Sequence, residues 1–124
     1  QNPIVVWGDG TAKRDFVYSG DVADCMIKII EKKYQQPINI GSGKGTSIKK
    51  LVNLLSEIIP SEKKPKVIFD KSKPSGDKIR ILDVKTLNSL GIYCKTNIKS
   101  GLKETFNWYL KNKYLTKKRY NFFN

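Results

Sequence analysis

The sequence predicts a small α/β domain of short strands and about four helices, and three observations support that class. Short apolar runs at 4–7 and 67–70 have the composition of strands. Longer stretches at 21–33, 47–59 and 97–111 repeat apolar residues at helical spacing. The length of 124 residues suits one compact domain with a modest core.

The first strand leads into a glycine-rich turn, Gly8-Asp9-Gly10, and 14–18 reads as a second strand. The two strands carry Trp7 and Arg14 on either side of this tight loop. An aromatic ring suits a flat ligand group, and a guanidinium binds phosphate oxygens through paired hydrogen bonds. The alternative interpretation is an ordinary β-hairpin with a packed Trp7 and a solvated Arg14.

Residues that start or stop helices set the next boundaries. Pro37 ends the first helix before a short strand expected at 38–40. Thr46 or Ser47 is expected to cap the second helix, which Pro60 closes.

The C-terminal half reads as a loop, a short helix and a long helix. The stretch 71–77 is rich in lysine, serine and glycine and is expected to be irregular. Asp83 suits the start of a helix that ends at Gly91. Gly101 lies inside the last helix, where glycine costs about 1 kcal/mol relative to alanine, so we expect close backbone packing at that position.

A net charge of +13 raises the possibility of a stand-alone basic module that binds RNA or DNA. Only three of the 24 basic residues are arginines, namely Arg14, Arg80 and Arg119, and the lysines are scattered over every segment. Base readout favours arginine. We therefore expect a solvated lysine surface that attracts anions and no specific nucleic-acid partner.

Several classes of chemistry are excluded or disfavoured by composition. The chain has no histidine, which removes histidine acid–base catalysis and most zinc sites, so no metal is expected. Cys25 and Cys94 form no Cys-x-x-Cys pattern and are expected to be reduced thiols in a cytoplasmic protein. No apolar run approaches the ~20 residues of a membrane span.

Two motifs resemble known sites without completing them. Gly41 to Thr46 looks like the end of a P-loop, but Ile38 stands where the pattern needs its first glycine. Tyr109 with Lys113, and Tyr114 with Lys118, have the spacing of a Tyr-x-x-x-Lys dyad. Such matches arise by chance in a lysine-rich chain. We assign no ATP site to the first motif and no catalytic residue to the second.

An ordered series of motifs nevertheless resembles one enzyme family. It comprises the Trp7–Phe16 stretch, Ile38-Asn39-Ile40-Gly41-Ser42-Gly43, Thr46-Ser47-Ile48-Lys49-Lys50-Leu51, Asp70-Lys71-Ser72-Lys73-Pro74-Ser75-Gly76-Asp77, Arg80-Ile81-Leu82-Asp83, Leu90-Gly91-Ile92, and Ile98-Lys99-Ser100-Gly101-Leu102 with Trp108-Tyr109. Taken together, these motifs resemble the C-terminal portion of extended short-chain dehydrogenases that act on nucleotide sugars. Within that superfamily the Asp-x-Ser-Lys-Pro-x-Gly stretch is most similar to the GDP-L-fucose synthases, the GDP-4-keto-6-deoxymannose epimerase-reductases.

The resemblance implies that residues 1–111 are the substrate-binding portion of a larger enzyme, followed by a basic, aromatic tail at 112–124 in which we expect partial disorder. The chain begins without Met, which agrees with a piece of a longer protein. The Rossmann core, with bound NADP(H) or NAD and the catalytic dyad, would belong to the rest of that enzyme, a homodimer. GDP-4-keto-6-deoxymannose is the favoured substrate. The alternative within the superfamily is a UDP-sugar 4-epimerase or a dehydratase.

The resemblance also implies that the glycine-rich stretch 41–46 is a strand-to-helix turn, and it assigns substrate contacts. The basic residues Arg14 and Arg80 would face the substrate diphosphate, and Trp7 would pack on the substrate. Ser75 stands where the fucose branch tends to have an acid, so it carries over weakly and leaves the sugar and base open. On the residues alone, Arg80 and Asp83 are equally well explained as a surface pair or a helix cap.

Overall fold

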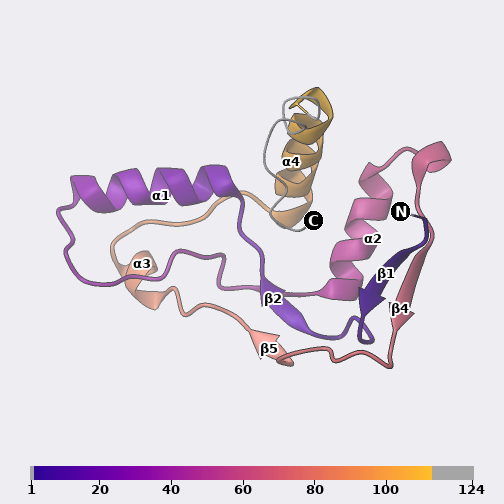
Figure 1. Cartoon of the computed structure of the whole chain (residues 1–124). Coiled ribbons are helices and arrows are strands. Elements are labelled where there is room, and N and C mark those ends of the chain that lie inside the picture. The colour runs from indigo at the N-terminus through magenta and orange to yellow at the C-terminus, as the bar shows by residue number, and fades with distance from the viewer. Residues whose placement is uncertain (1, 113–124) are drawn as a thin grey trace, which may run out of the picture.

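A computed structural model describes residues 2–112, and Figure 1 shows its helices and short strands. The elements, in chain order, are β1 (Ile4–Trp7), β2 (Lys13–Asp15), α1 (Ser19–Glu31), β3 (Gly45–Ser47), α2 (Ile48–Ile58), a 3-10 turn (Ser61–Lys63), β4 (Val67–Asp70), β5 (Ile79–Arg80), α3 (Lys85–Ser89) and α4 (Ile98–Asn112). The predicted class, a small α/β fold of short strands and about four helices, is confirmed for residues 2–112. No helix in the part described has the length and apolar character needed to cross a membrane. The expectation for the tail concerns residues almost all outside 2–112.

The strands form two small sheets rather than a hairpin. β1 pairs in parallel with β4, with Ile4 opposite Val67. β2 lies in the other sheet, between antiparallel β3 and parallel β5. The hairpin interpretation is therefore wrong, because β1 and β2 each find a partner far along the chain. The second strand is also shorter than predicted, ending at Asp15 rather than at 18.

The strand expected at 38–40 does not form. No described strand pairs with this segment, and a strand needs a neighbour to accept and donate its backbone hydrogen bonds. Ile38 and Ile40 instead pack against the cluster of Cys25, Leu87 and Ile92. The apolar alternation that predicted a strand is used for packing alone.

Helix boundaries follow the predicted signals closely. The hydroxyl of Ser47 accepts the backbone N–H of Lys50 at 3.1 Å and caps α2. α3 begins one residue later than predicted, because Val84 and not Asp83 is its N-cap. The Asp83 carboxylate accepts the backbone N–H of Lys85 at 2.9 Å from the position before the N-cap. Gly91 follows α3 with a φ of 72°, the left-handed conformation expected after a helix end.

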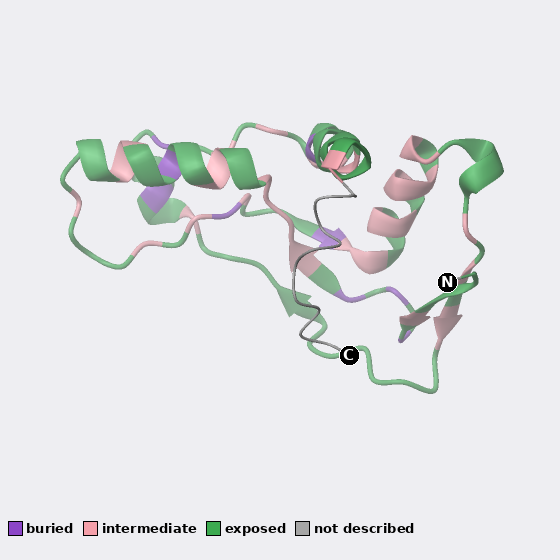
Figure 2. Cartoon of the chain, turned by 45° about the horizontal axis from the view of Figure 1, so that its top comes forward, coloured by how far each residue is buried: buried purple, intermediate pink, exposed green. Residues whose placement is uncertain are grey.

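The core is small and lies at one end of the molecule, where α1 passes over α3 (Figure 2). Its fully buried side chains are Cys25, Leu87 and Ile92. At the other end, α2 lies beside the β1–β4 sheet (Figure 1). Between them, Gly101 of α4 approaches Tyr18 so closely that an added Cβ would lie 3.3 Å from the Tyr18 Cβ. The predicted close packing at Gly101 is confirmed.

Candidate functional site

The loop between β4 and β5, residues 71–78, lies against the ends of β1 and β2. Ser75 sits directly on Gly8: a Cβ built on Gly8 would come within 2.3 Å of the Ser75 Oγ. Gly8 also adopts a φ of 81°, which side chains disfavour. Glycine at this position therefore lets the loop rest on the backbone that follows Trp7.

Arg14 holds the other end of the same loop. Its Nη1 donates to the carbonyl oxygen of Asp77 at 2.7 Å and to that of Lys13 at 2.8 Å. The backbone N–H of Lys13 donates to the carbonyl of Lys78 at 2.8 Å, which continues the contact between β2 and the loop. One guanidinium nitrogen is thus engaged by the protein, and the Arg14 side chain is fixed in place.

Arg80 lies directly beside Arg14. The two residues are partners in the parallel pairing of β2 with β5, and paired residues of neighbouring strands project to the same face of the sheet. Arg80 is exposed and Arg14 is half-buried. Two like charges held on adjacent strands repel each other, so this arrangement favours an anion that bridges them.

Trp7 and Ser75 complete the set of residues predicted from the sequence. Trp7 ends β1 with 64% of its surface exposed, so its ring is available to a ligand. The loop 71–78 joins the set, because it contacts Gly8 next to Trp7 and the guanidinium of Arg14. We name this region, Trp7, Arg14, Ser75 and Arg80 with the loop 71–78, the arginine edge.

The turn between Trp7 and Arg14 is held by its own side chains. The Asp9 carboxylate accepts the backbone N–H of Thr11 at 2.9 Å and its hydroxyl at 2.6 Å. These hydrogen bonds hold the pKa of the Asp9 carboxyl below its usual value. Asp9 is therefore anionic at neutral pH and is occupied with the turn.

Asp15 was not singled out by the sequence, yet it organises the strands behind the arginine edge. Its carboxylate accepts the backbone N–H groups of Ser42 and Gly43, each at 2.9 Å, and the Ser42 hydroxyl. The N–H of Leu82, just after β5, reaches the same carboxylate at 3.4 Å. Asp15 follows Arg14 on β2, so the two side chains take opposite faces of the sheet.

These contacts explain why the glycine-rich stretch 41–46 is not a phosphate loop. A P-loop binds phosphate with its backbone N–H groups, and here the amides of Ser42 and Gly43 already bind the carboxylate of Asp15. The end of the stretch lies in β3, and α2 follows directly. The helix at this end agrees with the expected strand-to-helix turn. The sequence showed only that glycine is frequent in this stretch. Glycine content does not tell whether the backbone amides bind a phosphate or a carboxylate of the protein.

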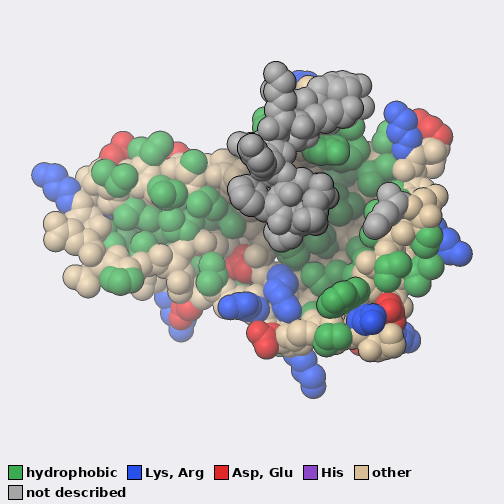
Figure 3. Space-filling view, viewed as in Figure 1, with side chains coloured by type: hydrophobic (Ala, Val, Ile, Leu, Met, Phe, Trp, Pro, Cys, Tyr) green, Lys and Arg blue, Asp and Glu red, His purple; other side chains and the backbone are tan. Residues whose placement is uncertain are grey.

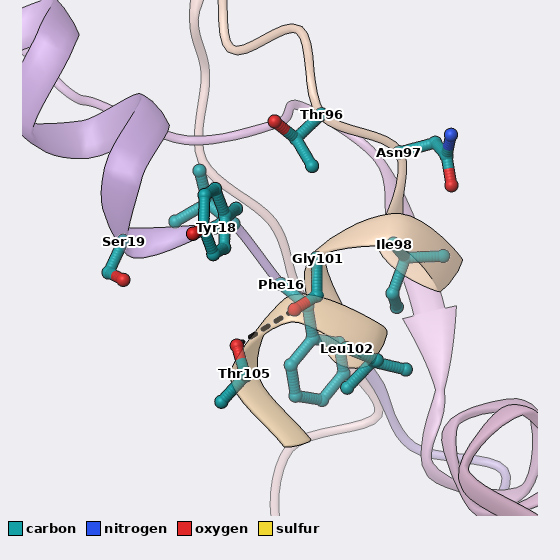
Figure 4. A pocket seen from close by; sticks show the side chains of 10 residues that line it. Phe16, Tyr18, Ser19, Thr96, Asn97, Ile98, Gly101, Leu102 and Thr105 are labelled. Carbon is teal, nitrogen blue, oxygen red and sulfur yellow. Dashed lines mark hydrogen bonds between the residues drawn. The ribbon is translucent and has the colours of Figure 1, made fainter. Parts of the chain in front are cut away.

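A pocket of about 280 Å³ lies between α4 and the segment that links β2 to α1 (Figure 4). Apolar surface comes from Phe16, Val17, Tyr18, Ile98 and Leu102, and polar groups come from Ser19, Thr96, Asn97 and Thr105. Two hydroxyls are already used: Thr105 donates to the carbonyl of Gly101 at 2.8 Å, and Thr96 donates to Asp21 at 2.9 Å. The pocket therefore offers mainly apolar surface, and we place the candidate site at the arginine edge.

Charge on the surface is mixed. On the face shown in Figure 3, Lys and Arg side chains lie over the region of β2 and β5, with acidic side chains among them, and others lie at both ends of the molecule. This face shows no single basic stripe of the kind that follows a nucleic-acid backbone. The local concentration at the arginine edge comes from the pairing of two strands.

Most of the chain is similar in sequence to known proteins. The family model described as "NAD dependent epimerase/dehydratase family" matches residues 1–41. GDP-L-fucose synthase of Escherichia coli is 34% identical over 119 residues, and GDP-L-fucose synthase 1 of Arabidopsis thaliana is 36% identical over 110. Each alignment covers 88% of this chain. The chain is homologous to the GDP-L-fucose synthases.

Solved structures show the same relationship for the fold. A GDP-6-OMe-4-keto-L-xylo-heptose reductase from Campylobacter jejuni superposes on 90% of the chain with a TM-score of 0.76 and 28% identity. A UDP-glucose 4-epimerase from Thermotoga maritima, solved with UDP-glucose, superposes on 89% with a TM-score of 0.70 and 30% identity. These matches confirm the predicted fold as part of the extended epimerase and reductase fold.

This chain spans about a third of the length of the GDP-L-fucose synthases that it matches, 36% of the Escherichia coli enzyme and 33% of the Arabidopsis enzyme. The two solved structures are covered to a similar extent, 34% and 35%. About two thirds of each of these proteins therefore lies outside the match to this chain.

A related GDP-mannoheptose C4 reductase from Campylobacter jejuni was solved with NADP bound. The residues of this chain do not fit a dinucleotide site of their own. Gly41-x-Gly43-x-Gly45 has Thr46 where the dinucleotide fingerprint needs glycine or alanine, and its amides at 42 and 43 bind Asp15.

Proposed function

We propose that this chain is the substrate-binding part of an NAD(P)-dependent nucleotide-sugar epimerase or reductase, and that the arginine edge binds the substrate diphosphate. The observation that carries the proposal is the side-by-side placement of Arg14 and Arg80 on β2 and β5. Two guanidinium groups on one face can each donate to phosphate oxygens. The homologues named above supply the substrate class.

In this proposal each residue has a distinct role. Arg14, held by the Asp77 carbonyl, presents the rest of its guanidinium to one phosphate. Exposed Arg80 binds the other phosphate or bridges the two. Trp7 packs against a flat part of the nucleotide, and Ser75 places a hydroxyl next to Gly8 at the edge of the site. None of these residues transfers a proton or hydride; they position the substrate, which is a large part of catalysis.

The nicotinamide cofactor, NADP(H) or NAD, and the Tyr-x-x-x-Lys dyad belong in this proposal to the part of the enzyme outside the chain. Exposed apolar side chains on α1, including Ile27 at 57% and Ile30 at 73%, agree with a domain that is covered in a larger protein. We accordingly propose residues 1–111 as a substrate-binding domain with a separate tail. The complete enzyme is proposed to be a homodimer.

The favoured substrate is GDP-4-keto-6-deoxymannose, because the curated homologues are GDP-L-fucose synthases. A UDP-sugar 4-epimerase is the second candidate. Ser75 in place of the acid of the fucose branch favours it, as does the 30% identity to the Thermotoga maritima epimerase.

Calorimetric titration of the full-length protein tests the proposal and separates its two candidates. GDP is expected to bind at least tenfold more tightly than GMP, because the second phosphate gains a charge-assisted hydrogen bond worth about 1.5–3 kcal/mol. GDP binding more tightly than UDP supports the fucose branch, and the reverse order supports the epimerase. Equal affinities for GDP and GMP would contradict diphosphate recognition.

A further inference from the structure

The two cysteines of the chain, 69 residues apart in sequence, meet in the fold. Their Sγ atoms lie 3.7 Å apart and share a hydrogen bond. Cys25 lies in the middle of α1 and is fully buried, whereas Cys94 lies in the segment between α3 and α4 and is half-buried. Both are free thiols. The sequence spacing gave no sign of this contact.

We infer that Cys25 and Cys94 are a site of reversible disulfide formation, which cross-links α1 to the segment that enters α4. A disulfide bond is about 2.05 Å long, so the sulfur atoms need to approach by less than about 2 Å. Side-chain rotation and a small shift of the half-buried segment at Cys94 can supply that movement. The core side chains that pack around the pair, among them Leu87 and Ile92, are apolar and offer no competing reaction.

The disulfide would link α1 to the segment before α4, and these two already share hydrogen bonds. Asp21, one turn before Cys25 on α1, accepts the backbone N–H of Thr96 at 2.7 Å and its hydroxyl at 2.9 Å. Tyr18, just before α1, and Thr96, in the segment that enters α4, both line the pocket in Figure 4. A bond between Cys25 and Cys94 therefore links the two segments that carry these lining residues.

The order of chemical steps follows from exposure. A low-molecular-weight disulfide such as oxidised glutathione is attacked by the Cys94 thiolate, which forms a mixed disulfide and releases one glutathione thiolate. Cys25 then loses its proton and attacks the Cys94 sulfur, which releases the second glutathione. Two protein thiols are oxidised and one small disulfide is reduced to two thiols, so atoms and electrons balance.

The surroundings of Cys94 make the first step slow at neutral pH. Burial, the hydrogen bond with Cys25 and the nearby carboxylates of Asp21 and Asp15 raise the pKa of Cys94 to about 12. The thiolate is the reactive form, so the rate should rise about tenfold per pH unit between pH 7 and 10. The pair is thus stable as thiols under mild conditions and is cross-linked under oxidising ones.

Peptide mapping of the full-length protein after incubation with oxidised glutathione tests this inference. Tryptic cleavage places Cys25 in peptide 15–28 and Cys94 in peptide 86–95. A linked pair of these peptides is expected in the wild type and should disappear after dithiothreitol. Cys25→Ser should accumulate glutathione on Cys94, and Cys94→Ser should leave the buried Cys25 unmodified.

Thermal unfolding provides the second readout. The oxidised wild type should melt at a higher temperature than the reduced form, and neither serine variant should show this difference. The inference is overturned if the linked peptide is absent at pH 9 while Cys94 of the wild type carries glutathione. It is equally overturned if both thiols stay free up to pH 10.

Discussion

At the scale of single residues, the two tryptophans are similarly exposed but lie in different parts of the fold. Trp7 is 64% exposed and Trp108 is 58% exposed, so neither is a core residue. Trp7 ends β1 beside the loop 71–78, whereas Trp108 lies on α4. Of these two residues Trp7 belongs to the arginine edge, so Trp108 can serve as its control.

Replacing Trp7 with phenylalanine should remove most of the change in tryptophan fluorescence that follows addition of a nucleotide sugar to the full-length protein. The reason is that the indole of Trp7 is the one proposed to pack on the ligand. Trp108→Phe is the matched control and should leave the change intact. If Trp7→Phe keeps the full response, Trp7 is not at the ligand.

At the scale of elements, local signals were readable from the sequence and pairings were not. Ser47 and Gly91 act through neighbours within a few residues, so their roles as a helix cap and a helix end could be predicted. The pairing of Trp7 with Asp70 joins residues far apart in the chain, as does the contact of Cys25 with Cys94. Periodicity carries no information about such partners.

The same limit applied to the candidate site. The sequence nominated Arg14 and Arg80 through resemblance, but their adjacency depends on β2 pairing with β5. Asp15 was missed because its partners, Ser42, Gly43 and Leu82, come from two other segments. The strand expected at 38–40 failed for the converse reason: its composition suits a strand, but no described neighbour pairs with it.

Asp15→Asn should therefore destabilise the fold by about 1.5–3 kcal/mol, because one acceptor oxygen becomes an N–H donor that faces backbone donors. Urea unfolding measures the change in the free energy of unfolding. Asp83→Asn is the control: Asp83 is exposed and accepts one backbone N–H next to α3, a role in which asparagine performs as well. Similar unfolding midpoints for Asp15→Asn and the wild type would show that the carboxylate is dispensable.

At the scale of the whole molecule, the chain is a small domain with apolar side chains left on its surface and a length about a third of that of its homologues. Its small core, with Cys25, Leu87 and Ile92, lies at one end and the arginine edge lies away from it. This distribution agrees with the division of labour proposed here: substrate contacts in this chain and redox chemistry elsewhere.

The 124-residue chain alone should bind no NADPH, because its sequence has no complete dinucleotide fingerprint and the amides of Ser42 and Gly43 in its glycine-rich stretch already bind Asp15. Titration followed by nicotinamide fluorescence gives the answer, with the full-length protein as the positive control. A saturating signal at micromolar NADPH from the chain alone would place cofactor binding within it.

The most direct test of the arginine edge is the kinetics of Arg14→Ala and Arg80→Ala in the full-length enzyme. Each variant should lower kcat/KM for the nucleotide sugar about ten- to a hundred-fold, the loss of one charge-assisted contact worth roughly 1.5–3 kcal/mol. Cofactor affinity should stay near that of the wild type. Lys85→Ala is the control, since this substitution removes the same charge from a nearby side chain that is 91% exposed. Wild-type kcat/KM in both arginine variants would contradict the account and leave the two residues with a structural role.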